Sequence, residues 1–305
     1  MKYYIGIDGG GTKTKCILTD ENLNPLFENL GGPSNFLVIG AEKVSNTIFD
    51  HITKCTESQK ISPDQIAAIV LGTTGAGRKS DIEVLQNQIS NDAKQRNIVI
   101  NKFSIESDAR IALEGAFSGN AGSILIAGTG SIMFGKDKDG IIHRIGGYGR
   151  YIGDEGSGYR IGRKGLNAVA RAFDGRSKQT RISDLLQQEF SISSPEDLIT
   201  EVYRNNFNIP SVAPIVFEAA ESGDVTAQRI LEDEANELLL HISAMKTKLN
   251  VSLLKVSLIG SILTTANYFS YLFNEMVVRK HNDVKIMEAE HSPEFGAVLM
   301  AKQLV

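Results

Sequence analysis

The chain has 305 residues, of which 42% are hydrophobic and 22% are charged, and its formal net charge is −4. This length favours two lobes over a single core, and the mildly acidic balance argues against general nucleic-acid binding. No apolar run approaches the roughly 20 residues of a membrane span, and the first residues enter a strand at once. Because the two cysteines, Cys16 and Cys55, form no metal-like pair, we expect a cytoplasmic protein with reduced thiols.

A glycine-rich turn lies close to the N-terminus. Residues 3–18 read YYIGIDGGGTKTKCIL, so an apolar run ends at Asp8 and alternation resumes after three glycines and a threonine. This pattern predicts a β-hairpin rather than a strand that enters a helix. The open backbone N–H groups of such a turn suit phosphate oxygens, and Asp8 at the strand end suits a hydrated magnesium ion. The alternative is an ordinary hairpin turn, for which two glycines would suffice.

Two better-known nucleotide motifs are excluded at this turn. A Walker A loop has Gly immediately before Lys, whereas Thr12 precedes Lys13. A dinucleotide fingerprint needs Gly at the first, third and sixth positions and a helix afterwards, and residues 6–14 lack this spacing.

The rest of the first half predicts an α/β lobe. In chain order we expect a strand at 26–30, a helix from 41, a strand at 66–71, a helix from about 80 and a strand at 98–105. That last strand runs into Asp108, where a helix begins. The lobe is therefore a β-meander followed by alternating strands and helices.

A similar pattern then starts again. An apolar strand at 123–127 is followed by a Gly-Thr-Gly-Ser turn, a second strand and a hairpin into 141–145. A segment rich in glycine, aromatic and acidic residues follows at 146–158, and helices extend from there almost to residue 250. Strands at 256–259 and 284–287 and a C-terminal helix from Pro293 complete the chain. Two glycine turns, each after an apolar strand, predict duplicated lobes that hold a nucleotide.

Four segments together resemble a known family. They are DGGGTKT at 8–14, GTGS at 128–131, GDEGSGY at 153–159 and LIGS at 258–261. Over nearly the whole chain this set resembles the N-acetylglucosamine kinases, the BadF/BadG/BcrA/BcrD ATPase-type branch of the sugar kinase, actin and heat-shock chaperone superfamily. The resemblance implies an α/β chain with a two-lobed ribonuclease H-like (actin-like ATPase) fold, duplicated βββαβαβα domains and a nucleotide cleft between them. It places the N-terminal lobe at 1–114, with the C-terminal helix 290–305 packing back on it, and a C-terminal lobe with helical insertions at 115–289.

The activity that this resemblance implies is ATP-dependent transfer of the γ-phosphate to the 6-hydroxyl of an amino sugar. The expected acceptor is N-acetylglucosamine, with glucosamine, N-acetylmuramic acid or another hexose as alternatives. ATP and Mg²⁺ are the implied cofactors, a small sugar is the implied partner, and a homodimer without nucleic-acid or membrane partners is expected. The family usually has Trp where Tyr148 stands and often Asn where Ser107 stands, and it frequently has a glycine pair where Gly260 is followed by Ser261. These departures leave the identity of the sugar open.

The resemblance also implies roles for individual residues. Asp8 corresponds to the aspartate that holds magnesium, and Asp108 to the general base that takes the proton of the sugar hydroxyl. The implied phosphate- and nucleotide-binding residues are Gly9, Gly10, Gly11, Thr12, Lys13, Gly128, Thr129, Gly130, Ser131, Gly260 and Ser261. The candidate sugar-binding residues are Asn35, Thr74, Asp108, Gly147, Tyr148, Asp154 and Glu155.

Structural roles remain open for several of these residues. Asp108 or Ser107 could cap a helix, Asn35 could be a turn residue and Thr74 could simply end a strand. Tyr148 could pack within its loop, Asp154 and Glu155 could pair with Arg150 or Arg160, and Lys13 could be solvated.

Two other functions use the same fold. An activator ATPase needs cysteines that bridge an iron–sulfur cluster between subunits, and the positions of Cys16 in a hairpin and Cys55 in a helix argue against it. A non-catalytic sugar sensor or filament-forming ATPase is disfavoured because Asp8, both glycine turns and Asp108 are all present.

Overall fold

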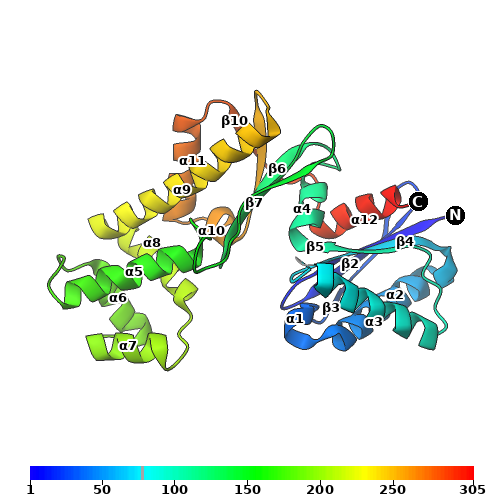
Figure 1. Cartoon of the computed structure of the whole chain (residues 1–305), viewed down its shortest axis with the longest axis horizontal. Helices are drawn as coiled ribbons and strands as arrows, with labels where there is room; N and C mark the ends of the chain where they lie inside the picture. The colour runs from blue at the N-terminus through cyan, green and yellow to red at the C-terminus, as the bar shows by residue number, and fades with distance from the viewer. Residues whose placement is uncertain (77–78) are drawn as a thin grey trace. The chain divides into compact units, whose positions relative to one another are not determined.

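The structure is a computed structural model that describes residues 1–76 and 79–305. The chain divides into two compact units, unit 1 with Met1–Gly122 and Glu288–Val305, and unit 2 with Ser123–Met287 (Figure 1). The division falls after Gly122 rather than after the expected residue 114. Residue 114 lies inside helix α4 (Asp108–Ala116), and Phe117 beyond that helix is still buried.

Unit 1 is a five-stranded mixed sheet covered by helices. The sheet order is β3-β2-β1-β4-β5, in which β1 is antiparallel to β2 and parallel to β4, and β4 is parallel to β5. The elements are β1 (Tyr3–Gly9), β2 (Thr14–Asp20), β3 (Pro25–Gly31), α1 (Phe36–Ile39), α2 (Ala41–Gln59), η1 (Pro63–Gln65), β4 (Ile66–Thr73), α3 (Lys79–Gln95), β5 (Phe103–Ser107), α4 and α12 (Pro293–Gln303).

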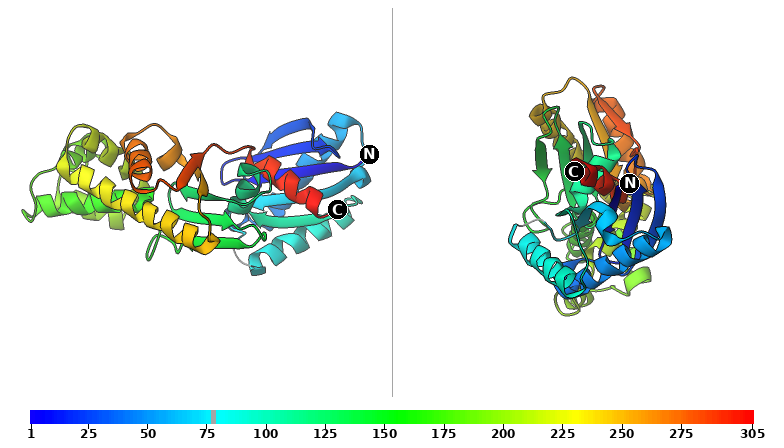
Figure 2. Two further views of the ribbon diagram at one scale, coloured as in Figure 1. Left: turned by 90° about the horizontal axis from the view of Figure 1, so that it is seen from above. Right: turned by 90° about the vertical axis from the view of Figure 1, so that its right-hand side faces the viewer.

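Strand β1 separates the two apolar layers of unit 1. Because side chains alternate across a strand, Ile5 and Ile7 pack into one cluster with α2 and α3, whereas Tyr4 packs on the other face with α4 and α12. Gly6 shares the face of Tyr4, and a Cβ added there would lie 2.0 Å from the carbonyl oxygen of Glu294 in α12. The C-terminal helix therefore lies directly on the first strand, so both chain termini belong to unit 1 (Figure 2).

Unit 2 repeats the strand pattern of unit 1. Its sheet order is β10-β9-β6-β7-β8, in which β9 is parallel to β6 and β10, and β7 is antiparallel to β8. The strands are β6 (Gly122–Ala127), β7 (Ser131–Lys136), β8 (Ile142–Gly146), β9 (Leu254–Ile259) and β10 (Val284–Met287). The prediction of an α/β chain with a duplicated strand pattern is confirmed.

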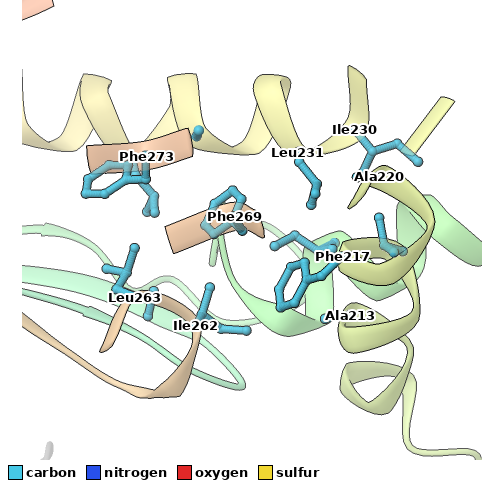
Figure 3. Packing of buried hydrophobic residues seen from close by; sticks show 14 of the residues in the cluster. Ala213, Phe217, Ala220, Ile230, Leu231, Ile262, Leu263, Phe269 and Phe273 are labelled. Atoms are coloured by element: carbon cyan, nitrogen blue, oxygen red, sulfur yellow. The ribbon is translucent and has the colours of Figure 1, made fainter. Parts of the chain in front are cut away.

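Helices form most of the core of unit 2. They are α5 (Gly158–Phe173), α6 (Arg181–Phe190), α7 (Pro195–Tyr203), η2 (Ile209–Val212), α8 (Ala213–Glu221), α9 (Val225–Leu249), α10 (Ser261–Thr264) and α11 (Tyr268–Lys280). Phe217 of α8 and Phe269 of α11 stack with their ring centroids 6.0 Å apart, beside Leu231 of α9 (Figure 3). The long helix α9 is thereby fixed against the rest of the unit.

One predicted strand is shorter than expected. The strand expected at 98–105 is β5, and residues 98–101 instead form a connection. In this connection the Asn101 side-chain amide donates to the carbonyls of Asp64 and Ile66, at 2.8 and 2.7 Å.

Among the described residues, no helix combines the length and apolar character that crossing a bilayer requires.

Candidate active site

The first glycine turn is the tip of the predicted hairpin between β1 and β2. Gly9 pairs with Thr14 across the two strands, and the Gly10 N–H donates to the Lys13 carbonyl at 3.0 Å. A Cβ added to Gly11 would meet no other atom within 4 Å. The tip therefore presents open backbone, and its Thr12 and Lys13 side chains are exposed.

Ser34 anchors this turn, and the sequence did not predict its role. The buried Ser34 hydroxyl is hydrogen-bonded to Thr14 Oγ1 at 2.7 Å, and the backbone N–H of Ser34 donates to the Gly10 carbonyl at 3.0 Å. Thr73, the last residue of β4, donates its hydroxyl proton to the Ser34 carbonyl at 2.8 Å. A Cβ on Gly9 would lie 2.3 Å from Ser34 Oγ, so the close approach at this point requires glycine. The turn is thus fixed both to the end of β4 and to the loop before Asn35.

Asp8 lies on the face of the sheet that α4 and α12 cover, two residues beyond Gly6. The pKa of its carboxyl is raised from 3.8 to about 6. Burial is the largest cause, the negative charges of Glu294 and Asp108 act in the same direction, and the positive charges of Lys15 and Lys13 partly offset them. Glu294, at the start of α12, is 8% exposed, and Lys15 Nζ lies 3.8 Å from its Oε1. Its Oε2 is buried without a hydrogen-bond partner among the residues that the structure describes. The sequence did not identify Glu294 as a neighbour of Asp8.

The residues around Asp8 fit a hydrated magnesium ion better than a closed metal site. No group of three or more His, Cys, Asp or Glu side chains is placed to enclose a metal within residues 1–76 and 79–305. A carboxyl with a pKa of about 6 is mostly ionised at neutral pH. Asp8 can therefore supply one oxygen to Mg²⁺, which commonly keeps several waters and takes further oxygens from substrate phosphates.

Asp108 is the first residue of α4, directly beyond the end of β5. Ser107 is the N-cap of that helix, since its side chain accepts the Arg110 N–H at 3.1 Å. The Asp108 carboxylate accepts the Ala109 N–H at 2.8 Å and the Thr74 hydroxyl at 2.8 Å. Thr74 comes immediately after β4, so the carboxyl ends of two neighbouring parallel strands bring the two side chains together.

Asn35 lies beside this pair. It occupies the N-cap position of α1, but its side chain makes no capping hydrogen bond. Its Oδ1 is buried without a partner among the described residues and lies 3.4 Å from the position of a Cβ on Gly75, the residue after Thr74. Unit 1 therefore gathers Asn35, Thr74 and Asp108 near the ends of β4 and β5, and an amide oxygen there is left without a protein donor.

The second glycine turn joins β6 to β7 in unit 2. The Gly158 N–H donates to the Gly128 carbonyl at 2.8 Å, and the Tyr159 N–H donates to the Thr129 carbonyl at 3.2 Å. Ser131 Oγ donates to the Glu155 carbonyl at 2.5 Å. These bonds attach the turn to the Gly153–Tyr159 segment, so two of the four sequence motifs form one structural unit.

The third motif of unit 2 lies next to the same turn. Gly260 has a φ of +94° and is the N-cap of α10, which begins at Ser261. A Cβ on Gly260 would lie 2.3 Å from the carbonyl oxygen of Ala127, the last residue of β6. The Gly260–Ser261 segment is therefore packed against the start of the second glycine turn.

Asp154 faces that turn in a left-handed backbone conformation with a φ of +59°. Its Oδ2 lies 2.8 Å from the position of a Cβ on Gly130, and its Oδ1 accepts the Gly149 N–H at 3.2 Å. Burial raises the pKa of this carboxyl, and the backbone N–H groups of Gly149 and Ser131 partly offset the rise. Within the described residues neither Asp154 nor Glu155 forms an ion pair with Arg150 or Arg160, although the sequence allowed it. Arg150 instead lies over the Tyr151 and Tyr159 rings, at 5.1 and 5.8 Å.

Tyr148 does not pack into the core of its loop. Its side chain is 70% exposed, and the Arg144 guanidinium lies 5.5 Å from the centre of its ring. The neighbouring Gly147 has a φ of +70° and contacts the Ile132 side chain closely. A cavity of about 590 Å³ in unit 2 is lined by residues that include Thr129, Gly130 and Asp154. The cavity therefore lies beside the second glycine turn, and Tyr148 is not among the described residues that line it.

The chain matches the BadF/BadG/BcrA/BcrD ATPase family over residues 5–301. The chain belongs to the BadF/BadG/BcrA/BcrD ATPase family. It is 34% identical over 307 residues to the N-acetylmuramic acid/N-acetylglucosamine kinase of Clostridium acetobutylicum, with 99% of each chain covered. It is 30% identical over 313 residues to the N-acetyl-D-glucosamine kinase of Dictyostelium discoideum, with 98% of this chain and 97% of that protein covered.

A solved structure has a similar fold. The protein from Chromobacterium violaceum, which was proposed to be an N-acetylglucosamine kinase, covers 99% of both chains with a TM-score of 0.73 and 23% identity. The expected membership of the BadF/BadG/BcrA/BcrD ATPase family is therefore confirmed, and the curated relatives named above are sugar kinases.

Proposed function

We propose that this chain transfers the γ-phosphate of ATP to the 6-hydroxyl of an amino sugar, with N-acetylglucosamine as the first candidate acceptor. The observation that carries the proposal is the Asp108 carboxylate, which Thr74 holds at the carboxyl ends of β4 and β5 by a 2.8 Å hydrogen bond. Ligands of open α/β sheets bind at these strand ends. The sugar kinase relatives support the same reaction.

In this proposal Asp108 is the general base. One of its oxygens accepts the Thr74 hydroxyl and the other accepts the Ala109 N–H, so the carboxylate is oriented before a substrate arrives. Each carboxylate oxygen has a further lone pair, and one of these would accept the proton of the attacking sugar hydroxyl. The unpaired Oδ1 of Asn35 would accept a hydrogen bond from another hydroxyl of the sugar.

The first glycine turn, Gly9 to Lys13, would bind phosphate oxygens through its open backbone, and Lys13 would add a positive charge. A magnesium ion at Asp8, when bound, would neutralise charge on the transferring phosphate. The buried Ser34 network would keep the turn rigid, because all the polar groups that it joins are satisfied by protein. Gly9, Gly10, Gly11 and Thr12 need no side-chain chemistry for this role.

Unit 2 would contribute the second phosphate turn and further sugar contacts. Gly128 to Ser131 would bind phosphate, and Gly260 with Ser261 would approach the adenosine part of ATP. Gly147, Tyr148, Asp154 and Glu155 would contact the sugar, with the exposed Tyr148 ring against an apolar face of the acceptor. The half-buried carboxyl of Asp154 would accept hydrogen bonds from sugar hydroxyls.

The acceptor is the least constrained part of the proposal. Glucosamine, N-acetylmuramic acid and other hexoses share the 6-hydroxyl, and the relative from Clostridium acetobutylicum is named for two amino sugars. An activator ATPase is a weaker candidate, because Cys16 and Cys55 are both buried inside unit 1, where they cannot bridge a cluster to a second subunit. We also propose that the enzyme works in the cytoplasm and that it forms a homodimer. Light scattering of the purified chain would test the dimer.

A coupled ADP-release assay over a panel of sugars tests the proposal. The panel contains N-acetylglucosamine, glucosamine, N-acetylmuramic acid, N-acetylmannosamine and glucose, each with ATP and Mg²⁺. We expect N-acetylglucosamine, or another amino sugar of the panel, to stimulate ADP release well above the rate without sugar. If no sugar stimulates turnover, the kinase proposal is wrong.

A further inference from the structure

Helix α9 of unit 2 supports the glycine-rich segment between Gly146 and Gly158 along one face. Glu234, Leu238 and His241 are spaced four and three residues apart, so they share a face of the helix. A Cβ on Gly146 would lie 2.3 Å from His241 Nε2, and a Cβ on Gly156 would lie 2.3 Å from the Leu238 side chain. Both ends of the segment therefore rest on α9.

The polar part of this support is the fully buried carboxylate of Glu234. Its Oε2 accepts the Gly156 N–H at 2.6 Å, and its Oε1 lies 2.8 Å from Lys164 Nζ of α5. Glu234 is 0% exposed, whereas the neighbouring Asp233 is 59% exposed and lies 3.7 Å from the same lysine. Of these two neighbouring acids, Glu234 is the one that is hydrogen-bonded to the backbone of the segment.

A fully buried carboxylate paired with a partly exposed lysine is poor evidence for a purely stabilising role. Removing the carboxylate from water is costly, and well-packed apolar residues are often at least as stabilising. Here the carboxylate instead satisfies a backbone N–H in a strained stretch. Asp154 has a φ of +59°, which is uncommon for a residue other than glycine, and Gly156 has a φ of +77°. Such a conformation persists only where its surroundings hold it in place.

We propose that Glu234, paired with Lys164, is a positioning residue that fixes the Asp154–Glu155 segment in its sugar-binding conformation. This inference rests on the sugar-contacting role proposed above for Asp154 and Glu155. Glu234 holds Gly156, Ser131 holds the Glu155 carbonyl, and Gly149 bonds the Asp154 carboxylate. Loss of the Gly156 bond would release the segment at the point nearest its two acids, while the second glycine turn keeps its own hydrogen bond between Gly128 and Gly130.

The inference predicts a selective change in kinetics. Glu234→Gln keeps the size of the side chain, but it replaces the charged acceptor and places an amide against Lys164. Because the Gly156 N–H loses its charged acceptor and the segment is held less firmly, we expect the KM for the sugar to rise about tenfold. We expect the KM for ATP to change by a smaller factor than the KM for the sugar, because the second glycine turn keeps the hydrogen bond between Gly128 and Gly130 and its links to Gly158 and Tyr159.

The experiment compares four variants of the full chain. Asp233→Asn is the matched control, since it removes an adjacent, exposed carboxylate beside the same lysine and should leave both KM values unchanged. Lys164→Met removes the cation that pairs with Glu234, and Lys164 is partly exposed. It should raise the KM for the sugar, as Glu234→Gln does. If Glu234→Gln does not fold, the KM of Lys164→Met tests the inference instead. Asp154→Asn reports whether the segment contacts sugar at all.

Hydrogen exchange of the amides in residues 149–158 provides a readout that is independent of activity. We expect faster exchange there in Glu234→Gln and Lys164→Met than in Asp233→Asn. If the folded variants keep both the wild-type sugar KM and the wild-type exchange, Glu234 is a structural residue only and the inference is wrong. If Asp154→Asn leaves the sugar KM unchanged, the sugar role proposed for this segment fails instead, and the exchange of residues 149–158 alone then decides whether Glu234 positions it.

Discussion

Thr74 donates its hydroxyl proton to the Asp108 carboxylate, with Thr74 Oγ1 2.8 Å from Asp108 Oδ2. The other carboxylate oxygen accepts the Ala109 N–H, so both oxygens of Asp108 are held by the protein. A carboxylate held at two points keeps its orientation when a sugar hydroxyl approaches. The pair explains why Thr74, which carries no proton-transfer chemistry of its own, would matter for catalysis.

Replacing Thr74 by Val should therefore lower kcat more than it changes ATP binding. The variant keeps the branched shape but removes a hydrogen bond to a charged group, a loss of roughly 1.5–3 kcal/mol, so we expect kcat to fall by about ten- to a hundredfold. Thr74→Ser restores a hydroxyl and should recover most of the activity. Steady-state kinetics with saturating ATP measures kcat for both variants. Equal kcat values of the Val and Ser variants would show that the Thr74–Asp108 hydrogen bond does not contribute to catalysis.

Alanine at Gly9 and alanine at Gly11, two of the three glycines of the first turn, should have different effects on stability and on ATP binding. A Cβ on Gly9 would lie 2.3 Å from Ser34 Oγ and 3.1 Å from the Gly72 carbonyl, whereas a Cβ on Gly11 would meet nothing within 4 Å. Overpacking of this kind typically costs about 1–3 kcal/mol, so Gly9→Ala should destabilise unit 1 and Gly11→Ala should not. We expect Gly11→Ala to weaken ATP binding, because its methyl group would occupy the open space beside the turn. Thermal unfolding and ATP titration measure the two effects, and a stable Gly9→Ala protein would contradict the close packing at Ser34.

His51 predicts how stability depends on pH. It is buried in α2 against Asn29, and burial, followed by the positive charge of Lys54, lowers its pKa from 6.5 to about 4. The unfolded chain binds a proton near pH 6.5 that the folded chain does not bind until about pH 4. Stability is therefore fully present above pH 6.5 and is lost as the pH falls toward 4.

The measurement is urea unfolding of the wild type and His51→Gln at pH 7 and pH 5. Between these two values we expect the free energy of unfolding of the wild type to fall by up to about 2 kcal/mol more than that of the variant. The comparison uses only the difference between the two pH values, so the hydrogen bond to Asn29 that the variant alters does not affect it. Equal falls in the two proteins would show that His51 titrates normally in the folded chain.

Local patterns in the sequence predicted the parts of the site that depend on near neighbours. The hairpin at Asp8 to Thr14 follows from alternation and glycine, and the position of Asp108 follows from a strand that runs into a helix. The end of the helical region at Leu249 and the start of α12 at Pro293 also agree with the expected positions. These features are encoded within a few residues of one another.

The parts that the sequence did not predict depend on contacts between distant segments. Glu294 approaches Asp8 only because α12 returns to β1, and Glu234 approaches Gly156 only because α9 packs beneath the glycine-rich segment. Ser34 has no local sequence signal for its role, because the two threonines that bond to it, Thr14 and Thr73, come from distant strands. The expected strand at 98–105 was too long because the apolar residues of its first half suggested pairing, whereas the pairing with β4 begins only at Phe103.

Replacing Asp108 by Asn tests the central claim most directly. The measurement is phosphorylation of N-acetylglucosamine, followed by phosphorus NMR, beside a calorimetric titration of the same protein with ATP. Asn keeps the shape of Asp but cannot take the proton, so we expect transfer to fall by at least about a hundredfold while ATP binding stays close to that of the wild type. If Asp108→Asn phosphorylates the sugar at the wild-type rate, Asp108 is not the base and the proposed mechanism is wrong.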